Sequence, residues 1–224
     1  MVIQEEIGKD MNGDGKISFP TLPHLSDNNE EWKYSMRRTM QEIVPGVFLG
    51  PYSAAMRSKL NDLKSNGITH IICVRHTLEA QFIRANFLEH FNIRSISIFC
   101  NSRYLILDIA DSATQNIIQH FSTVKDFIDD TLDQGGKVLV HGNAGISRSA
   151  ALVLAYVMEK YGLSIKEAYD LVQQRRFCIN PNDGFMAQLR EFEPIYKAQR
   201  LLQHGQTSAD TVRNKRTCDE LEDS

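Results

Sequence analysis

The sequence lacks a long apolar run, a secretory signal and closely spaced cysteines. No run reaches the roughly 20 residues of a membrane-spanning helix. Residues 1–10 include Glu5 and Glu6 and have no apolar core, so we expect no signal peptide. The cysteines are Cys73, Cys100, Cys178 and Cys218. Their wide spacing predicts no metal site, and we expect no cofactor, no membrane contact and a cytoplasmic or nuclear location. Cys73 and Cys178 lie in apolar stretches and are expected to be buried, reduced thiols.

An excess of basic residues is also missing. The 224 residues include 25 Lys or Arg and 28 Asp or Glu, for a formal net charge of −3. General nucleic-acid binders usually carry a basic excess, so we expect no nucleic-acid partner. Hydrophobic residues make up 42% of the chain, enough for one globular domain with its own core, which we expect to be a monomer.

The chain divides by composition into a core and two tails. Residues 1–30 are polar and rich in Gly, Asp and Asn, and we interpret them as a flexible extension. Residues 204–224 have little apolar content and are predicted to be a disordered tail. Residues 31–203 alternate strand and helix patterns, which predicts an α/β domain with a mainly parallel central sheet flanked by helices.

Periodicity places the elements of this domain. Strands are expected at 44–49, 68–74, 104–109 and 137–141. Helices are expected at 53–65, 116–132 and 148–161, with two more starting at Ser164 and near Asp183. The helix 116–132 has the clearest apolar face, the helix 148–161 is apolar on nearly all sides, and Ser164 with Glu167 forms a capping box.

The segment from Val138 to Ser149 is the most informative. An apolar strand enters a loop with glycines, and the loop opens a buried helix. Such a corner directs backbone N–H groups and the positive end of the helix dipole toward one point, where an anion binds well. Arg148 at the helix start can hold two oxygens of a phosphate side by side. A plain strand–turn–helix corner with a surface arginine is the alternative.

The residues of this loop resemble a known family. The protein tyrosine phosphatase signature is His-Cys, five residues and Arg, and the form Ala-Gly-x-Ser-Arg-Ser is typical of dual-specificity phosphatases. Matching positions are His141, Ser147, Arg148 and Ser149. Gly142 stands where the cysteine would be. The likeness covers about residues 36–200 and implies the dual-specificity protein phosphatase fold.

The glycine decides what the resemblance implies. In active members the cysteine thiolate attacks phosphorus, whereas Gly142 offers no nucleophile, and loss of a nucleophile costs about a million-fold in turnover. The resemblance therefore implies a pseudophosphatase, not an enzyme, whose loop still binds phosphate. The phosphate-binding candidates are Gly142, Asn143, Ala144, Gly145, Ile146, Ser147 and Arg148.

The resemblance also assigns supporting positions. Asp111 matches the general acid of active members, with Asp108 as a nearby competitor, and without phosphoryl transfer this acid would be vestigial. His141 is expected to be a hydrogen-bonded structural residue, and Ser149 flanks the signature arginine. Other supporting candidates are Arg175, Arg176 and Asn180. The two arginines form either a basic rim for phosphoproteins or an exposed helix end.

Two further segments depart from the family pattern. Residues 10–21 begin like a calcium-binding EF-hand loop, but Thr21 replaces the glutamate at position twelve and Pro20 precedes it. A plain turn is the favoured interpretation, with weak calcium binding as the alternative. Residues 92–102 look like an insertion that forms either an edge strand or a loop.

Three functions remain open from the sequence. The first is a module that binds proteins phosphorylated on Ser, Thr or Tyr, with mitogen-activated protein kinases among the candidates, and anchors or shields them. The second is a scaffold that uses another surface and leaves the pocket idle. The third, which we favour least, is an active phosphatase with a nucleophile other than cysteine.

Overall fold

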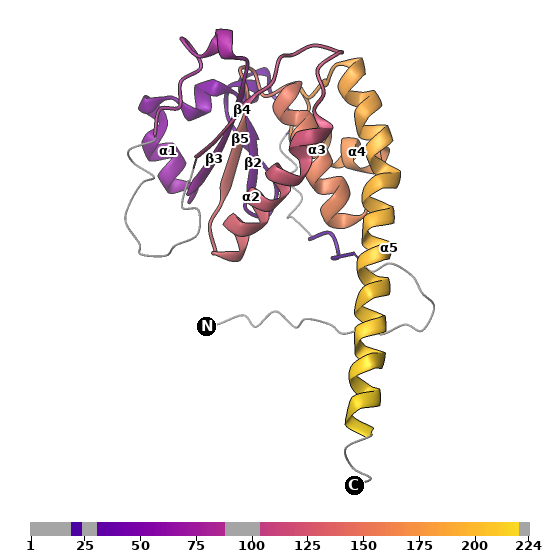
Figure 1. Cartoon of the computed structure of the whole chain (residues 1–224). Helices are drawn as coiled ribbons and strands as arrows, with labels where there is room; N and C mark the ends of the chain where they lie inside the picture. Colours follow the sequence, from indigo (N-terminus) through magenta and orange to yellow (C-terminus); the bar gives the residue numbers. More distant parts are fainter. Residues whose placement is uncertain (1–18, 24–30, 88–103, 220–224) are drawn as a thin grey trace.

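The computed structural model describes residues 19–23, 31–87 and 104–219, with side chains described as far as Leu202. The segment 92–102 lies outside these residues, as does most of the segment 10–21, so the expectations for both stay predictions. Figure 1 shows a central sheet with α1 on one side and the larger helices on the other.

Within the described residues, five strands form one sheet in the order β1-β2-β5-β3-β4. They are β1 (Gln41–Val44), β2 (Val47–Gly50), β3 (His70–Arg75), β4 (Tyr104–Asp108) and β5 (Val138–His141). Strands β2, β5, β3 and β4 run parallel, while β1 pairs antiparallel with β2. The predicted α/β fold with a mainly parallel central sheet is confirmed.

The first expected strand, 44–49, is part of a hairpin instead of one strand. Pro45 and Gly46 form the turn between β1 and β2. Gly46 has a φ of 79°, a left-handed conformation that glycine adopts without steric cost. The turn adds an antiparallel edge strand that the apolar run alone does not predict.

The strands alternate their side chains between two cores. In β3, Ile72 and Val74 face the larger core, whereas Ile71 and Cys73 face the smaller one. The larger core is covered by α2 (Phe121–Asp133), α3 (Arg148–Tyr161), α4 (Ile165–Arg175) and α5 (Asp183–Asp219). Helix α1 (Leu60–Ser65) covers the smaller core. The sheet is therefore buried on both faces, as parallel sheets usually are.

Short 3-10 helices connect several of these elements. They are η1 (Tyr34–Arg38), η2 (Tyr52–Ala55), η3 (Arg57–Lys59), η4 (Thr77–Glu79) and η5 (Ile118–His120). The expected helix 53–65 is divided among η2, η3 and α1, because Met56 adopts an extended backbone conformation. The expected helix 116–132 begins as η5 and becomes α-helical only at Phe121.

The helix that follows the glycine-containing loop has the bounds that the sequence predicts. Helix α3 spans residues 148–161 and ends at Gly162, which has a φ of 69°. Ser164 and Glu167 form the predicted capping box at the start of α4. These local sequence signals set the end of α3 and the start of α4.

The structure describes part of each tail. Helix α5 continues to Asp219, although the sequence predicts disorder over 204–224. Its last turns contain no proline, and an established helix gains a backbone hydrogen bond with each added residue. Within the extension 1–30, Phe19 packs edge-on against Tyr196, with 6.5 Å between ring centroids. The other expected boundaries stay predictions.

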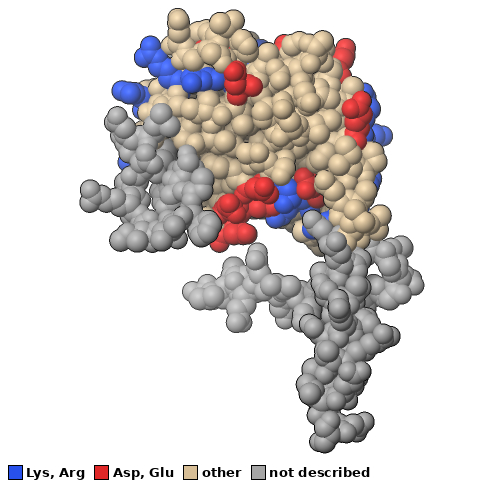
Figure 2. Space-filling view, viewed as in Figure 1, with Lys and Arg blue, Asp and Glu red and all other residues tan. Residues whose placement is uncertain are grey.

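The surface gives little guidance to a ligand site. No helix in the described part of the chain is both long enough and apolar enough to cross a membrane. On the face drawn in Figure 2, basic and acidic residues lie in small groups around a broad uncharged surface. The candidate site is therefore built from the loops at the ends of the strands.

Candidate functional site

The loop 142–147 connects β5, the middle strand of the sheet, to the buried helix α3. It follows the carboxyl end of a parallel strand, where open α/β sheets form their ligand sites. The loops after β3 and β4 leave the same edge, because these are the next two strands in the sheet. Three loops therefore contribute to one site.

Four consecutive carbonyls of the loop, those of residues 143–146, turn into the protein. The N–H groups of Tyr52 and Asn180 donate to the first and last of them, at 3.0 and 2.8 Å. The guanidinium of Arg176 donates to the two between. Among the described residues, none accepts a hydrogen bond from the N–H groups of residues 143–147. These N–H groups can therefore converge on an anion at the N-terminus of α3.

Gly145 lets the loop approach β2 closely. It has a φ of 66°, and a β-carbon there would overlap the carbonyl group of Gly50. Any other residue would therefore meet both backbone strain and a steric clash. Gly145 is therefore needed for the path of the loop backbone.

Arg176 lies beneath the loop, so neither expected role, a basic rim or an exposed helix end, fits this residue. Its side chain is fully buried. It donates to the backbone carbonyls of Arg37, Thr39, Ala144 and Gly145 and to the side chain of Gln41. A buried guanidinium loses its hydrogen bonds to water. These oxygens replace that water as acceptors, so the side chain can lie inside the protein. Arg175 is only partly buried.

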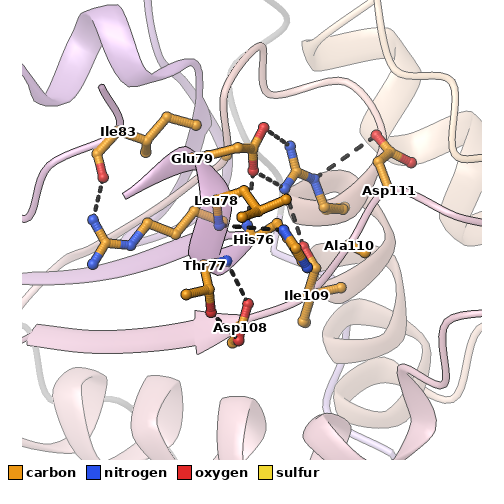
Figure 3. Close-up of polar contacts among 12 residues, drawn as sticks. His76, Thr77, Leu78, Glu79, Ile83, Asp108, Ile109, Ala110 and Asp111 are labelled. Carbon is orange, nitrogen blue, oxygen red and sulfur yellow. Dashed lines mark hydrogen bonds and ion pairs between the residues drawn. The ribbon is translucent and has the colours of Figure 1, made fainter. Parts of the chain in front are cut away.

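Arg148 begins α3 with only 7% of its side chain exposed. Its two terminal nitrogens donate to both carboxylate oxygens of Glu79, with Nη2 2.9 Å from Oε1. Nη1 also donates to the carbonyl of Ile109 at 3.0 Å, and Nε lies 3.8 Å from Oδ2 of Asp111. Figure 3 shows Glu79 and Asp111 approaching the same guanidinium from two loops. Glu79 fixes the outer end of the guanidinium. At the Nε edge, the Asp111 carboxylate lies beyond hydrogen-bond distance, so Nε has no hydrogen-bond acceptor among the described residues.

Glu79 is a site residue that the sequence does not reveal. It lies on η4, 69 positions before Arg148, and the N–H of His76 donates to its carboxylate at 2.7 Å. The hydrogen bond from Arg148 holds the pKa of Glu79 below its ordinary value, so the carboxylate is charged at neutral pH. No local pattern distinguishes it from a surface glutamate, because the contact exists only in the folded chain.

Asp108 holds the turn that carries Glu79. The N–H of Thr77 donates to Oδ1 of Asp108 at 2.8 Å, and the hydroxyl of Thr77 donates to Oδ2. The hydroxyl's hydrogen bond is the main reason that the pKa of Asp108 is lowered. Figure 3 shows Thr77 and Asp108 together, away from the guanidinium that Glu79 and Asp111 approach. Asp108 therefore has a structural partner of its own.

Asp111 lies beside the loop, next to Arg148. The hydroxyl of Ser147 donates to Oδ1 at 2.7 Å, and the side-chain amide of Asn182 donates to the same oxygen at 2.9 Å. The Asp111 side chain is 42% exposed. The structure therefore brings three candidates together and adds Asn182, which the sequence does not single out.

Gly142 forms the floor of the site and lies over Ser149. Its backbone is outside the left-handed region, and a β-carbon built there would stand 3.3 Å from Ser149 Oγ and 3.4 Å from Val74 O. The hydroxyl of Ser149 is buried and has no hydrogen-bond partner among the described residues. A β-carbon would therefore fit at the floor only if the Ser149 hydroxyl, which has no described partner, moved by a few tenths of an ångström.

His141 is fully buried at the end of β5. Its Nδ1 lies 3.2 Å from the carbonyl oxygen of Gly142. Burial lowers the pKa of His141 to about 4, so the ring is neutral at physiological pH. Its ring centroid lies 6.1 Å from that of Tyr52, which also contacts the loop through its N–H. These contacts fit a structural residue.

Neither described cysteine lies in the loop 142–147. Cys73 is buried in β3, where burial raises its pKa to about 12. Cys178 is partly exposed after α4, contrary to the expectation that it is buried. Within the described residues, no cluster of three or more His, Cys, Asp or Glu side chains could hold a metal ion.

Comparisons of the sequence and of the structure both find proteins of one family. The family model for the dual specificity phosphatase catalytic domain matches residues 47–195. Proteins named serine/threonine/tyrosine-interacting protein from Mus musculus and Homo sapiens are each 56% identical over 190 residues, 85% of this chain and 80% of theirs. The crystal structure of a human tyrosine phosphatase-like serine/threonine/tyrosine-interacting protein has a TM-score of 0.64 and 58% identity, covering 71% of this chain and 98% of that chain.

Proposed function

Because this chain belongs to the dual specificity phosphatase family, we propose that it is an inactive member that binds phosphorylated proteins through the loop from Gly142 to Arg148. One observation carries the proposal. The loop keeps its convergent N–H groups and its buried arginine, while glycine stands at the position of the attacking cysteine. A site of this kind retains its affinity for phosphate and loses its chemistry.

The remaining groups account for binding. The loop N–H groups and the Nε edge of Arg148 can donate to phosphate oxygens, and each hydrogen bond to a charged group contributes about 1.5–3 kcal/mol. Glu79 holds the arginine in place before the ligand arrives, which reduces the entropy lost on binding. Without a cysteine thiolate, the floor of the site also lacks the negative charge that would repel a phosphate dianion.

The same groups do not support turnover. Ser147 directs its hydroxyl to Asp111, and Ser149 lies behind Gly142, so neither hydroxyl occupies the attack position. His141 is neutral but fully buried. We therefore propose no enzymatic activity, and Asp111 keeps the position of a general acid that has no step to assist.

Binding alone is enough for a regulatory role. A domain that covers a phosphorylated Ser, Thr or Tyr can anchor its partner or shield the phosphate from active phosphatases and other phosphate readers. The relatives' name, which describes interacting proteins, supports protein partners. We propose kinase signalling in the cytoplasm or nucleus as the setting, with mitogen-activated protein kinases as the first partners to test.

The experiment compares phosphopeptide affinities of the wild-type protein and Arg148→Ala by fluorescence anisotropy. We expect binding that requires the phosphate and falls at least about ten-fold in the variant, because hydrogen bonds to a charged phosphate are lost. Arg148→Lys keeps the charge without the planar fork and should have an intermediate affinity. Arg57→Ala removes an exposed arginine from η3 and serves as the matched control.

Other results would favour the alternative functions. Partner binding that survives both Arg148→Ala and dephosphorylation of the partner would indicate a scaffold with an idle pocket. Sustained hydrolysis of an aryl phosphate by the wild-type protein, lost in Arg148→Ala, would indicate an enzyme with another nucleophile. Phosphopeptide affinity that is equal for wild type and a folded Arg148→Ala protein would refute binding at this loop.

A further inference from the structure

Two pockets that share residues of η1 form one path, and one of them adjoins the proposed phosphate-binding loop. The first has a volume of about 150 Å³ and is lined by Tyr34, Arg37, Arg38, Pro51, Ser53 and Ala144. The second has a volume of about 370 Å³ and is lined by Trp32, Tyr34, Arg37, Phe177, Cys178 and Ile179. Tyr34 and Arg37 line both pockets, and Ala144 belongs to the loop. We call this path the η1 groove.

The part of the η1 groove near the loop is positively charged. No described carboxylate lines either pocket. Arg37 and Arg38 form no ion pair with another described residue, and the Arg37 guanidinium lies 5.9 Å from the ring centroid of Tyr34. An acidic ligand would therefore meet two cations that form no ion pair with a described carboxylate, next to the loop proposed to bind phosphate.

The far part of the η1 groove is aromatic. Trp32 and Phe177 lie with ring centroids 6.5 Å apart, and the side chains of Phe177 and Tyr34 are 61% and 74% exposed. Large exposed aromatic side chains around a pocket are typical of places where a partner buries an apolar side chain. The groove thus changes from basic to apolar with distance from the loop.

Arg176 fixes the η1 groove relative to the loop. Its Nη2 donates both to the carbonyl of Arg37, at 3.1 Å, and to the carbonyl of Ala144, at 3.0 Å. The hydroxyl of Ser53 also donates to the carbonyl of Arg38 at 3.0 Å. The groove is therefore preformed, so a ligand that spans loop and groove need not order them on binding.

We propose that the η1 groove binds the chain of a phosphorylated protein beside its phosphoresidue. An acidic side chain of that segment pairs with Arg37 and Arg38, and an apolar side chain enters the pocket between Trp32 and Phe177. The occupant is an acidic, partly apolar phosphopeptide segment, since its charge complements the groove and its phosphate lies in the adjoining loop. This inference rests on the proposed function and adds a selection among phosphoproteins.

Trp32 makes the proposal directly measurable, because it is the single tryptophan of the chain. The probes are two phosphopeptides that differ only beside the phosphoresidue, one with Glu and Leu and one with Gly and Ser. Each is made with the varied residues before or after the phosphoresidue. With the varied residues on one side of the phosphoresidue, we expect the Glu-Leu peptide to bind about ten-fold more tightly than the Gly-Ser peptide. It should also shift the Trp32 emission.

Variants separate the groove from the loop. In Arg37→Ala combined with Arg38→Ala, the preference for the Glu-Leu peptide should shrink to the part that the leucine contributes between Trp32 and Phe177. Arg38→Glu should reverse the charge preference toward a peptide with Lys in place of Glu. The Arg176 contact survives in Arg37→Ala because it uses the backbone carbonyl. Arg57→Ala, on η3, should keep the wild-type preference.

The outcomes are distinct for the two proposals. Equal wild-type affinity for both peptides in both directions, or a Trp32 emission that does not change, overturns the η1 groove and leaves phosphate binding at the loop intact. Wild-type binding that ignores the phosphate overturns the proposed function, and the η1 groove as a phosphopeptide site with it.

Discussion

Replacing Gly142 with cysteine should turn this domain into a working phosphatase. The backbone at this position suits an ordinary residue, and the new β-carbon would stand 3.3 Å from Ser149 Oγ. A small rotation of that hydroxyl relieves the contact and directs it at the new sulfur. The loop N–H groups, the α3 dipole and Arg148 surround the sulfur, and such surroundings lower a thiol pKa from its ordinary value of about 8.5.

The expected gain is large because the nucleophile is the part that is missing. Loss of a nucleophile from an intact site costs about a million-fold in turnover, so its return should raise aryl phosphate hydrolysis by at least ~1,000-fold over wild type. Gly142→Ser is the matched control, since it adds a hydroxyl of similar size that does not ionise near neutral pH. Arg148→Ala in the Gly142→Cys background should abolish the gained activity.

A folded Gly142→Cys protein that binds phosphate and remains inert would refute this reasoning. The pH dependence of its alkylation by iodoacetamide would then locate the fault. A thiol pKa near that of free cysteine would show that the loop N–H groups do not stabilise a thiolate. A low thiol pKa without turnover would show that Asp111 does not act as an acid from its place beside Arg148.

Three further substitutions test the packing at the site and at the far end of α3. Glu79→Gln should lower the free energy of unfolding by about 1–3 kcal/mol in urea titrations, because it breaks the paired hydrogen bonds with Arg148. The folded-state pKa of Glu79 is lowered, so this stabilisation is complete above the ordinary glutamate pKa of 4.5 and is lost as the pH falls through the folded-state pKa. Unfolding free energies of the two proteins that stay apart in acid would contradict the account. Ser149→Ala removes a buried hydroxyl without a described partner and should leave stability equal or higher by about 1 kcal/mol, so a clear loss would count against it. Gly162→Ala should cost more than about 1 kcal/mol, because the position has a φ of 69° and a β-carbon would overlap Phe19; adding Phe19→Ala should recover only the steric part.

Much of the region around the loop could be predicted because its signals are local. Apolar periodicity and the glycines of the loop place α3 at the residues observed, and Ser164 with Glu167 marks the next helix start. The hairpin of β1 and β2 is not predicted, because β1 begins with the polar pair Gln41 and Glu42 and shares only Val44 with the expected strand 44–49, although Pro45 and Gly46 are ordinary turn residues. In a segment this short, the turn and a continuous strand have nearly the same apolar pattern.

The rest of the site depends on contacts between distant residues. Glu79 meets Arg148 only because β3 lies beside β5, and no pattern around Glu79 predicts that pairing. Arg176 looks like a surface cation at the end of a helix, yet carbonyl groups from two distant segments surround it. A charged residue is normally predicted to face water. A buried arginine held by carbonyl groups is therefore not recognised from the sequence.

The most direct measurement is a crystal structure of the protein with a bound phosphopeptide. The account predicts a phosphate over Gly142, with N–H groups of residues 143–147 and Nε of Arg148 donating to its oxygens, and with Glu79 still paired to the same guanidinium. A peptide bound elsewhere, or a loop too closed to admit the phosphate at saturating peptide, would contradict the central claim.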